Sequence, residues 1–282
     1  MRRLTYLLLL SMTLTWSCKS NSTEKTEETE ETETMDHEGH DHSDINTGVV
    51  LKAGDLTLTE IISDPFNEAK LSLVSPEANA MVESGSVKFD FKVDSFELGS
   101  QTSNAFANHC ANSAKGQHIH LILNNLPYTA HYESTFEQEV PDGKYVALAF
   151  LSRSYHESIK TPTAYQVFKF NVGEREQELD FDASAPHLFY SRPKGEYVGK
   201  DAEMVILDFY LINADLSSDG YKVKAKINGQ EVMIDKWAPY MMEGLPMGEN
   251  TIELTLLDAN GAMVISPFNP SIRTVTLKPA EE

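Results

Sequence analysis

The chain has 282 residues, of which 41% are hydrophobic, so it can bury the cores of two ordinary domains. Asp and Glu number 43 against 23 Lys and Arg, which gives a formal net charge of -20. This balance argues against nucleic acid as a partner and against adsorption to anionic lipid, because both require clustered positive charge.

Residues 1–17 predict a lipoprotein signal peptide. Two arginines precede the apolar run "LTYLLLLSMTLTW", and Cys18 follows it. The run is too short, and too interrupted by Ser and Thr, to predict a transmembrane helix. Ser17 is the small residue that such a signal carries before its cysteine, whereas Trp16 departs from the pattern; the alternative is a plain secretory signal or an uncleaved anchor. We expect a lipid on Cys18, which would make the protein an outer-membrane lipoprotein of the cell envelope.

Residues 18–48 predict a disordered tether that is acidic and rich in histidine. The segment is built mainly from Glu and Thr and has too few apolar residues to offset the entropy of ordering. His37, His40 and His42 stand there among carboxylates, a mixture that suits transition metals. We expect either a weak metal site or a merely solvated tether.

The rest of the chain contains one β-domain twice. Three pairs of segments match, at 71–93 with 188–211, 116–125 with 220–229, and 140–150 with 245–256. Alternation of apolar and polar residues dominates, and Asn228-Gly229 is typical of a hairpin turn that Asn124-Asn125 repeats. The sequence therefore predicts an all-β protein with two tandem immunoglobulin-like β-sandwiches, at 49–172 and 184–282, joined by a charged linker at 173–183.

The stretch "GQHIHLILNN" places His118 and His120 on one face of a predicted strand. The second copy carries Lys222 and Lys224 at the same positions. Because lysines are rarely buried, we expect this face to meet solvent in both copies. Two residues apart on a strand, the histidines lie about 6–7 Å apart at the backbone, close enough to reach one ion.

Further candidate ligands lie where the first copy departs from the second. An insertion at 99–115 carries His109 and Cys110, and the segment 152–162 carries His156 and Glu157 where the second copy has the turn "DANG". Histidines with a thiolate would suit zinc or copper. In the alternative interpretation the histidines are ordinary exposed residues and Cys110 is a small buried hydrophobe. His131, on the expected partner strand, is another candidate ligand, although we expect it simply to be exposed.

The motifs "GQHIHLILNNLPY", "VPDGKYVALAF" and "SRSYHESIK" resemble envelope lipoproteins of Bacteroidetes-type bacteria with immunoglobulin-like domains, some of which carry a phosphopeptide-binding label. The resemblance covers about residues 70–172. The signature positions it implies are His118, His120, Pro127, Tyr128, Gly143, His156 and Glu157. No cluster of Arg and Lys supports phosphate recognition in this chain.

Two functions of different classes follow, because the sequence contains no nucleophile elbow, P-loop, dinucleotide fingerprint or H-E-x-x-H motif. The first is a non-enzymatic envelope lipoprotein that captures or buffers zinc or copper through the first-domain histidines. The second is an adhesive or assembly module that binds a peptide or glycan through first-domain loops. A zinc hydrolase with an open coordination position is a third, less favoured, hypothesis.

Overall fold

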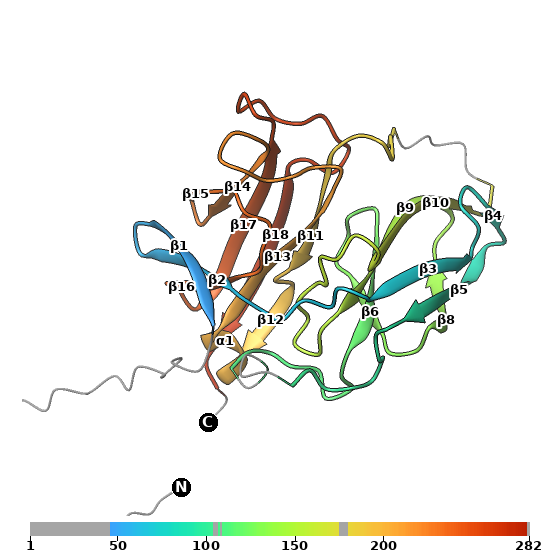
Figure 1. The fold of residues 1–282 in the computed structure, drawn as a ribbon, viewed down its shortest axis with the longest axis horizontal. Coiled ribbons are helices and arrows are strands. Elements are labelled where there is room, and N and C mark those ends of the chain that lie inside the picture. The colour runs from blue at the N-terminus through green and yellow to red at the C-terminus, as the bar shows by residue number, and fades with distance from the viewer. Residues whose placement is uncertain (1–45, 104–106, 108, 175–179, 281–282) are drawn as a thin grey trace, which may run out of the picture. The chain divides into compact units, whose positions relative to one another are not determined.

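The computed structural model describes residues 46–103, 107, 109–174 and 180–280 (Figure 1). These described residues belong to one compact unit. The predicted all-β class is confirmed: the described part consists of strands and one short helix, α1 (Lys200–Glu203). No helix within the described ranges is long and apolar enough to cross a membrane. The signal peptide, Cys18 and the tail histidines lie outside the described residues.

The first sandwich pairs a five-stranded sheet with a three-stranded one. The larger sheet has the order β4 (Met81–Val82), β10 (Tyr165–Val172), β9 (Gly143–Ser152), β6 (His118–Leu123) and β7 (Thr129–His131); the smaller has β3 (Lys70–Ser75), β5 (Gly85–Asp94) and β8 (Thr135–Val140). Alternation drives the packing, since Val87, Phe89 and Phe91 of β5 are buried while Lys88 and Lys92, which point to the other face, are exposed.

The second sandwich repeats this strand order and adds two further strands to one of its sheets. Its matching sheet runs β12 (Gly195–Val198), β18 (Ser271–Lys278), β17 (Gly248–Leu257), β14 (Lys222–Ile227) and β15 (Gln230–Ile234); the opposite sheet runs β1 (Thr47–Ala53), β2 (Leu56–Ile61), β16 (Tyr240–Glu243), β13 (Val205–Ile212) and β11 (His187–Arg192). In the first of these sheets in each copy, the strand that comes first in the chain pairs in parallel with the one that comes last, as β4 with β10 and β12 with β18. The topology supports a duplicated domain.

The hairpins of the two copies use the same turn chemistry. Asn124 and Asn125 have φ of 49° and 55°, and Asn228 and Gly229 have φ of 49° and 88°, as a type I′ turn requires. Each first asparagine also accepts a backbone hydrogen bond from the late strand, at 2.8 Å from Val146 in one copy and 2.9 Å from Thr251 in the other.

The expected start of the first sandwich at residue 49 is wrong. Strands β1 and β2 pair with each other, and β2 pairs antiparallel with β16 of the second sandwich. Leu56 and Leu58 are buried in the second core. Strands β1 and β2 therefore belong to the second sandwich, the next strands β3 to β10 form the first, and β11 to β18 complete the second. A strand with the alternating pattern of β2 can pair with the open edge of either sandwich, so the sequence could not assign β2 to one copy.

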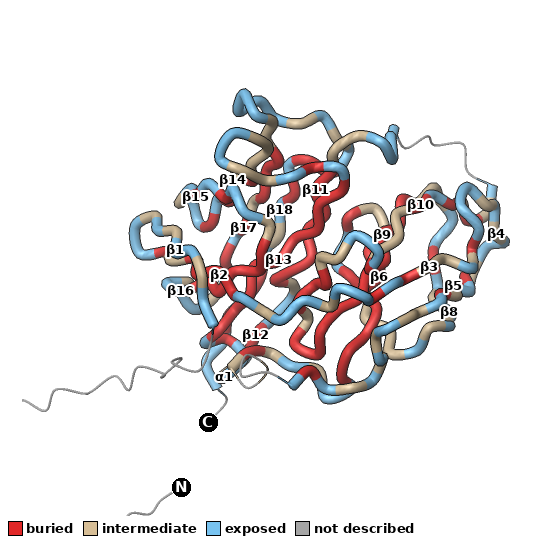
Figure 2. Tube along the Cα trace, in the orientation of Figure 1, coloured by how far each residue is buried: buried red, intermediate tan, exposed pale blue. Residues whose placement is uncertain are grey.

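The two sandwiches share a buried boundary. A separate apolar cluster joins the outer face of β6 and β9 to the outer face of β11 and β13, four strands that are largely buried (Figure 2). The cluster includes Phe150 and Tyr210, whose stacked rings have centroids 4.9 Å apart. Phe181, in the segment expected to be a charged linker, is buried in the same cluster. Residues 175–179 of that linker lie outside the described residues. The outer sheet face of the first copy is thus an interior surface.

Candidate metal centre

The face of β6 that carries His118 and His120 is buried, and its expected exposure to solvent is wrong. Both side chains do point away from the core of their own sandwich, because Ile119 and Leu121 occupy that side. Neither histidine has any exposed surface, however. The corresponding Lys222 and Lys224 are partly exposed, as expected. The difference arises because the second sandwich covers this face of the first.

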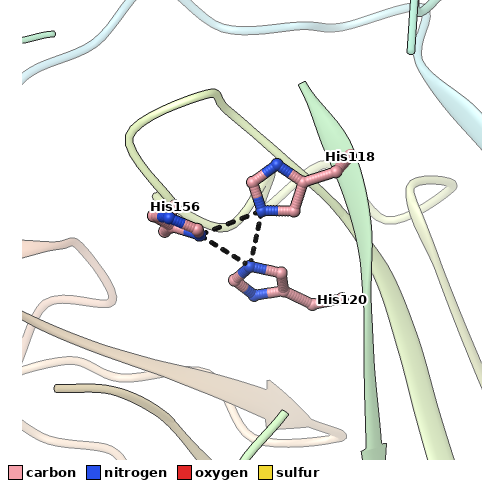
Figure 3. Close-up of side chains that lie close together, drawn as sticks. All are labelled: His118, His120 and His156. Carbon is pink, nitrogen blue, oxygen red and sulfur yellow. Dashed lines mark hydrogen bonds between the residues drawn. The ribbon is translucent and has the colours of Figure 1, made fainter. Parts of the chain in front are cut away.

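Three imidazoles converge in this buried space (Figure 3). His118 and His120 come from neighbouring same-face positions of β6, and His156 comes from the turn that follows β9. His118 Nε2 lies 2.8 Å from His120 Nε2 and 3.0 Å from His156 Nδ1. His120 Nε2 lies 3.3 Å from His156 Nδ1. We call these residues the three-histidine cluster; they are a group of metal-ligating type among the described residues.

The backbone fixes the orientation of His118. Its Nδ1 lies 2.8 Å from the carbonyl oxygen of Gly116, which can only accept a hydrogen bond, so Nδ1 carries the proton. The lone pair is therefore on Nε2 and points into the cluster, as in histidines that bind metals. Gly116 has φ of 83°, and a Cβ there would collide with the carbonyl oxygen of Gly99, so the position requires glycine. His120 has no such partner, since its buried Nδ1 has no hydrogen bond within the described part of the chain.

His156 occupies a backbone conformation that its counterpart fills with glycine. The bridge Ser152–Ser158 closes its turn, and the bridge Leu257–Met263 closes a turn of equal length in the second copy. His156 has φ of 68°, and Gly261, at the same place in that turn, has φ of 79°. The sequence comparison suggests an extra loop at 152–162 where the second copy has a tight turn, and this is wrong: the two turns have equal length, and His156 stands where the second copy has Gly261. An L-residue in this region costs about 1–2 kcal/mol, so the first copy tolerates strain in order to place an imidazole here.

Burial keeps the cluster neutral. Desolvation lowers the pKa of His118 to about 4, and it also lowers the pKa values of His120 and His156 well below their ordinary value, with nearby Arg192 and the other histidines contributing. Near neutral pH all three rings therefore carry a single proton each. Neutral imidazole is the form that coordinates a metal ion.

Hydrogen bonding alone cannot satisfy this arrangement. A neutral imidazole nitrogen either donates or accepts, and in a closed triangle two of three nitrogens must have the same role. His118 Nε2 is an acceptor, so His120 Nε2 can donate to it across 2.8 Å. His156 Nδ1 would then have to donate to His118 and accept from His120 at once. A cation that receives all three lone pairs removes this conflict.

The other predicted first-domain ligands do not join the cluster. Glu157 is outside the group, and its Oε2 accepts hydrogen bonds of 2.6 Å from the hydroxyl groups of Ser63 and Tyr155. Cys110 packs in an apolar cluster with Tyr155, and burial raises the pKa of its thiol to about 12, which disfavours a thiolate ligand. His109 precedes it in the insertion and is also outside the group.

His131 is also separate from the cluster. Its Nε2 lies 2.7 Å from Thr129 Oγ1, and its ring stacks on Phe136. The cluster therefore contains three of the seven first-domain residues that the sequence suggested as ligands.

The sequence did not reveal the groups that surround the cluster from the second sandwich. Arg192, almost fully buried, donates through Nη1 to the carbonyl oxygen of Tyr155, directly before His156, at 2.8 Å. Lys194 donates to the carbonyl oxygen of Tyr128 at 2.7 Å, and its Nζ lies 3.8 Å from the centre of the Tyr128 ring. Arg192 is the last residue of β11 and Lys194 follows in the turn after it, a segment with no sequence signal for a site in another domain.

No protein-family model matches the chain, and no curated protein matches it. Solved structures that resemble it include fibronectin(III)-like modules of CbhA from Clostridium thermocellum, at 14% identity over 74% of this chain and 95% of that one, with a TM-score of 0.26. Others are the central fibronectin-III array of RIM-binding protein (10%, 78% and 72%, TM-score 0.27) and SGBP-B of Bacteroides ovatus in complex with a mixed-linkage heptasaccharide (9%, 74% and 71%, TM-score 0.22). Such scores support no inference about function, and the fold assignment stands on the strand order above.

Proposed function

We propose that this protein is a non-enzymatic lipoprotein of the cell envelope that captures or buffers Zn²⁺ or copper in the three-histidine cluster. The observation that carries the proposal is the triangle of three neutral imidazole nitrogens, all within 3.3 Å of one another. Imidazole is a preferred ligand of both ions.

The size of the triangle fits such an ion. A triangle with sides of 2.8, 3.0 and 3.3 Å has a circumradius of about 1.8 Å, so an ion about 2.0–2.1 Å from each nitrogen lies about 1 Å out of its plane. That position leaves room for a fourth ligand. The proton of His120 would then reside on Nδ1, so His120 is the ligand with the weakest support.

Burial favours capture over catalysis. A hydrolytic zinc site needs an open position that substrate can reach. His118 and His120 have no exposed surface, and the second sandwich covers the face on which they stand. An ion held there exchanges slowly and is shielded from substrates. The lipid on Cys18 and the acidic tether with its three histidines would hold this site near the membrane and raise the local metal concentration.

The test measures metal bound to the purified full chain after dialysis, by mass spectrometry, and its affinity by competition with chelators. We expect one tightly bound Zn²⁺ or copper ion per chain. The double variant His118→Ala/His120→Ala should lose affinity by more than 100-fold, since losing an outer-shell partner alone costs 10–100-fold. The matched control, Lys222→Ala/Lys224→Ala, changes the corresponding positions of the second copy and should bind like the parent.

A third variant separates the tether from the cluster. Replacing His37, His40 and His42 with Ala should remove only weak binding. Circular dichroism of each variant shows that it is folded. Absence of a tight ion from the parent chain, or equal binding by the folded double variant, contradicts the proposal.

A second candidate is supported by a cavity of about 550 Å³ that segments of both sandwiches line. Trp237 and Phe66 lie in its wall beside Glu157 and Lys160. The Trp237 ring is held in place because Nε1 donates to the carbonyl oxygen of Phe209 at 2.9 Å. Aromatic surface next to charged groups suits a glycan or peptide. Binding that persists in chelator and is lost in Trp237→Ala would favour this adhesive function.

A further inference from the structure

Tyr128 lies beside the three-histidine cluster. The residue is buried, and its ring stacks on His120, with centroids 3.6 Å apart and planes 14° apart. Its phenol oxygen lies 3.4 Å from Nδ1 of His156. Two ligands about 2.0–2.1 Å from a tetrahedral ion are about 3.3 Å apart, so this oxygen is at ligand spacing from one corner of the triangle.

The charges around Tyr128 favour an anionic ligand once an ion is bound. Three neutral imidazoles leave the full charge of a divalent ion uncompensated. Lys194 adds a positive charge 3.8 Å from the centre of the Tyr128 ring, and buried Arg192 lies in the same interface. A phenolate would offset part of this positive charge, which solvent does not screen in a buried space.

Tyr132 provides a contrast next to the same cluster. Its ring lies 5.0 Å from that of His118. Its hydroxyl, however, is hydrogen-bonded to Ser113 Oγ at 2.7 Å. Of these two tyrosines, Tyr128 is therefore the one whose oxygen contacts a histidine of the cluster.

We propose that Tyr128 is the fourth ligand of the metal centre, bound through its phenol oxygen; this inference rests on the proposed function. On binding of the ion, the O–H bond of Tyr128 breaks, an oxygen–metal bond forms, and the proton passes to solvent. No electron is transferred. The centre then has three nitrogen ligands and one oxygen ligand, drawn from β6, the hairpin after it and the turn after β9.

Copper(II) is the probe for the test, because a phenolate bound to Cu²⁺ gives an intense charge-transfer band in the visible region and imidazoles do not. The full chain is loaded with one equivalent of Cu²⁺, and its absorption and electron paramagnetic resonance spectra are recorded. We expect the band in the parent chain. It should disappear in Tyr128→Phe, which still binds copper with a weaker affinity and an altered resonance spectrum.

Tyr132→Phe is the matched control and should keep the band. Copper bound at one equivalent by the parent without the band overturns the tyrosine ligand and leaves the three-histidine site intact. A band that persists in Tyr128→Phe also overturns it. Failure of the parent to bind copper or zinc overturns the proposed function together with this inference.

Discussion

The two sandwiches have matching strand orders, yet the outer face of the sheet that contains β6 is buried, whereas the outer face of the matching sheet, which contains β14, meets solvent. On β14 that face carries Lys222, Lys224 and Lys226, which are exposed or partly exposed. On β6 it carries two histidines that are fully buried against the second sandwich. A duplicated scaffold therefore yields one solvated face and one interior face, and candidate chemistry gathers on the interior one.

Single positions show how the copies diverged. His156 and Gly261 share a place in equivalent turns and a positive φ. Asp90 and Asp208 share a place on equivalent strands, but Asp90 is partly exposed and bonds to Thr135, whereas Asp208 is completely buried and pairs with Lys160 across the boundary. In each pair, the residue at the shared boundary carries an energetic cost: a positive φ for His156 and a buried charge for Asp208.

Removing the buried charge should give the largest difference between the copies. Asp208 accepts from Lys160 at 2.6 Å and from the backbone of Ser158 at 2.9 Å. Asp208→Asn leaves Lys160 without its counter-charge and should lower the free energy of unfolding by about 3–5 kcal/mol. Asp90→Asn should change it by about 0.5 kcal/mol. Urea unfolding of both variants measures this, and equal losses would contradict the asymmetry.

Acid should destabilise the metal-free protein through the buried histidines. The pKa of His118 is lowered from 6.5 to about 4 by burial, so the unfolded state binds its proton first. The stability that depends on neutral His118 is fully present above pH 6.5 and is lost as the pH falls towards 4, in total about 3 kcal/mol. His131 titrates in the same window because its pKa is also lowered to about 4.

Urea unfolding at a series of pH values checks the expectation, with His118→Gln as the variant. Its unfolding free energy should fall less steeply between these pH values than that of the parent. Lys222→Gln, at the matching position of the second copy, should leave the slope unchanged. The same slope in His118→Gln and the parent would refute the assignment.

The glycines that precede β6 and β14 should show a smaller difference in stability between the copies. Gly116→Ala meets a positive φ and the backbone of Gly99, and should cost about 2 kcal/mol of stability. Because Gly116 orients His118, metal affinity should also fall 10–100-fold. Gly220→Ala meets chiefly the movable Ser217 hydroxyl and should cost less. Similar losses of stability and metal affinity in the two variants would break the comparison.

The smallest change in stability should follow His156→Gly, which places in the turn after β9 the residue that the equivalent turn of the second copy has, Gly261. Relief of the positive φ offsets the greater chain entropy of glycine, so the free energy of unfolding should change by about 1 kcal/mol or less. Metal affinity should nonetheless fall sharply, because one of three ligands is lost. Chelator competition together with thermal unfolding separates the two effects. Unchanged affinity would remove His156 from the site.

Part of the site was predictable because strand alternation is local. Alternation placed His118 and His120 on one face of β6, and Ile119 and Leu121 do pack on the opposite face, in the core; turn chemistry predicted the Asn228-Gly229 hairpin. Whether that opposite face met water was not a local property. The comparison with Lys222 suggested exposure, and it failed because the two copies have different neighbours.

The amino-acid sequence by itself determined the β-class, the duplication and which side chains share a strand face, since these follow from a period of two and from turn residues acting over a few positions. Only the tertiary structure decided that β2 joins the second sandwich, that His156 reaches β6, and that Glu157 and Cys110 do not. Those outcomes depend on which sheet edges and faces meet. Contacts between residues far apart in the chain settle that question, because many alternative partners satisfy the same local pattern equally well.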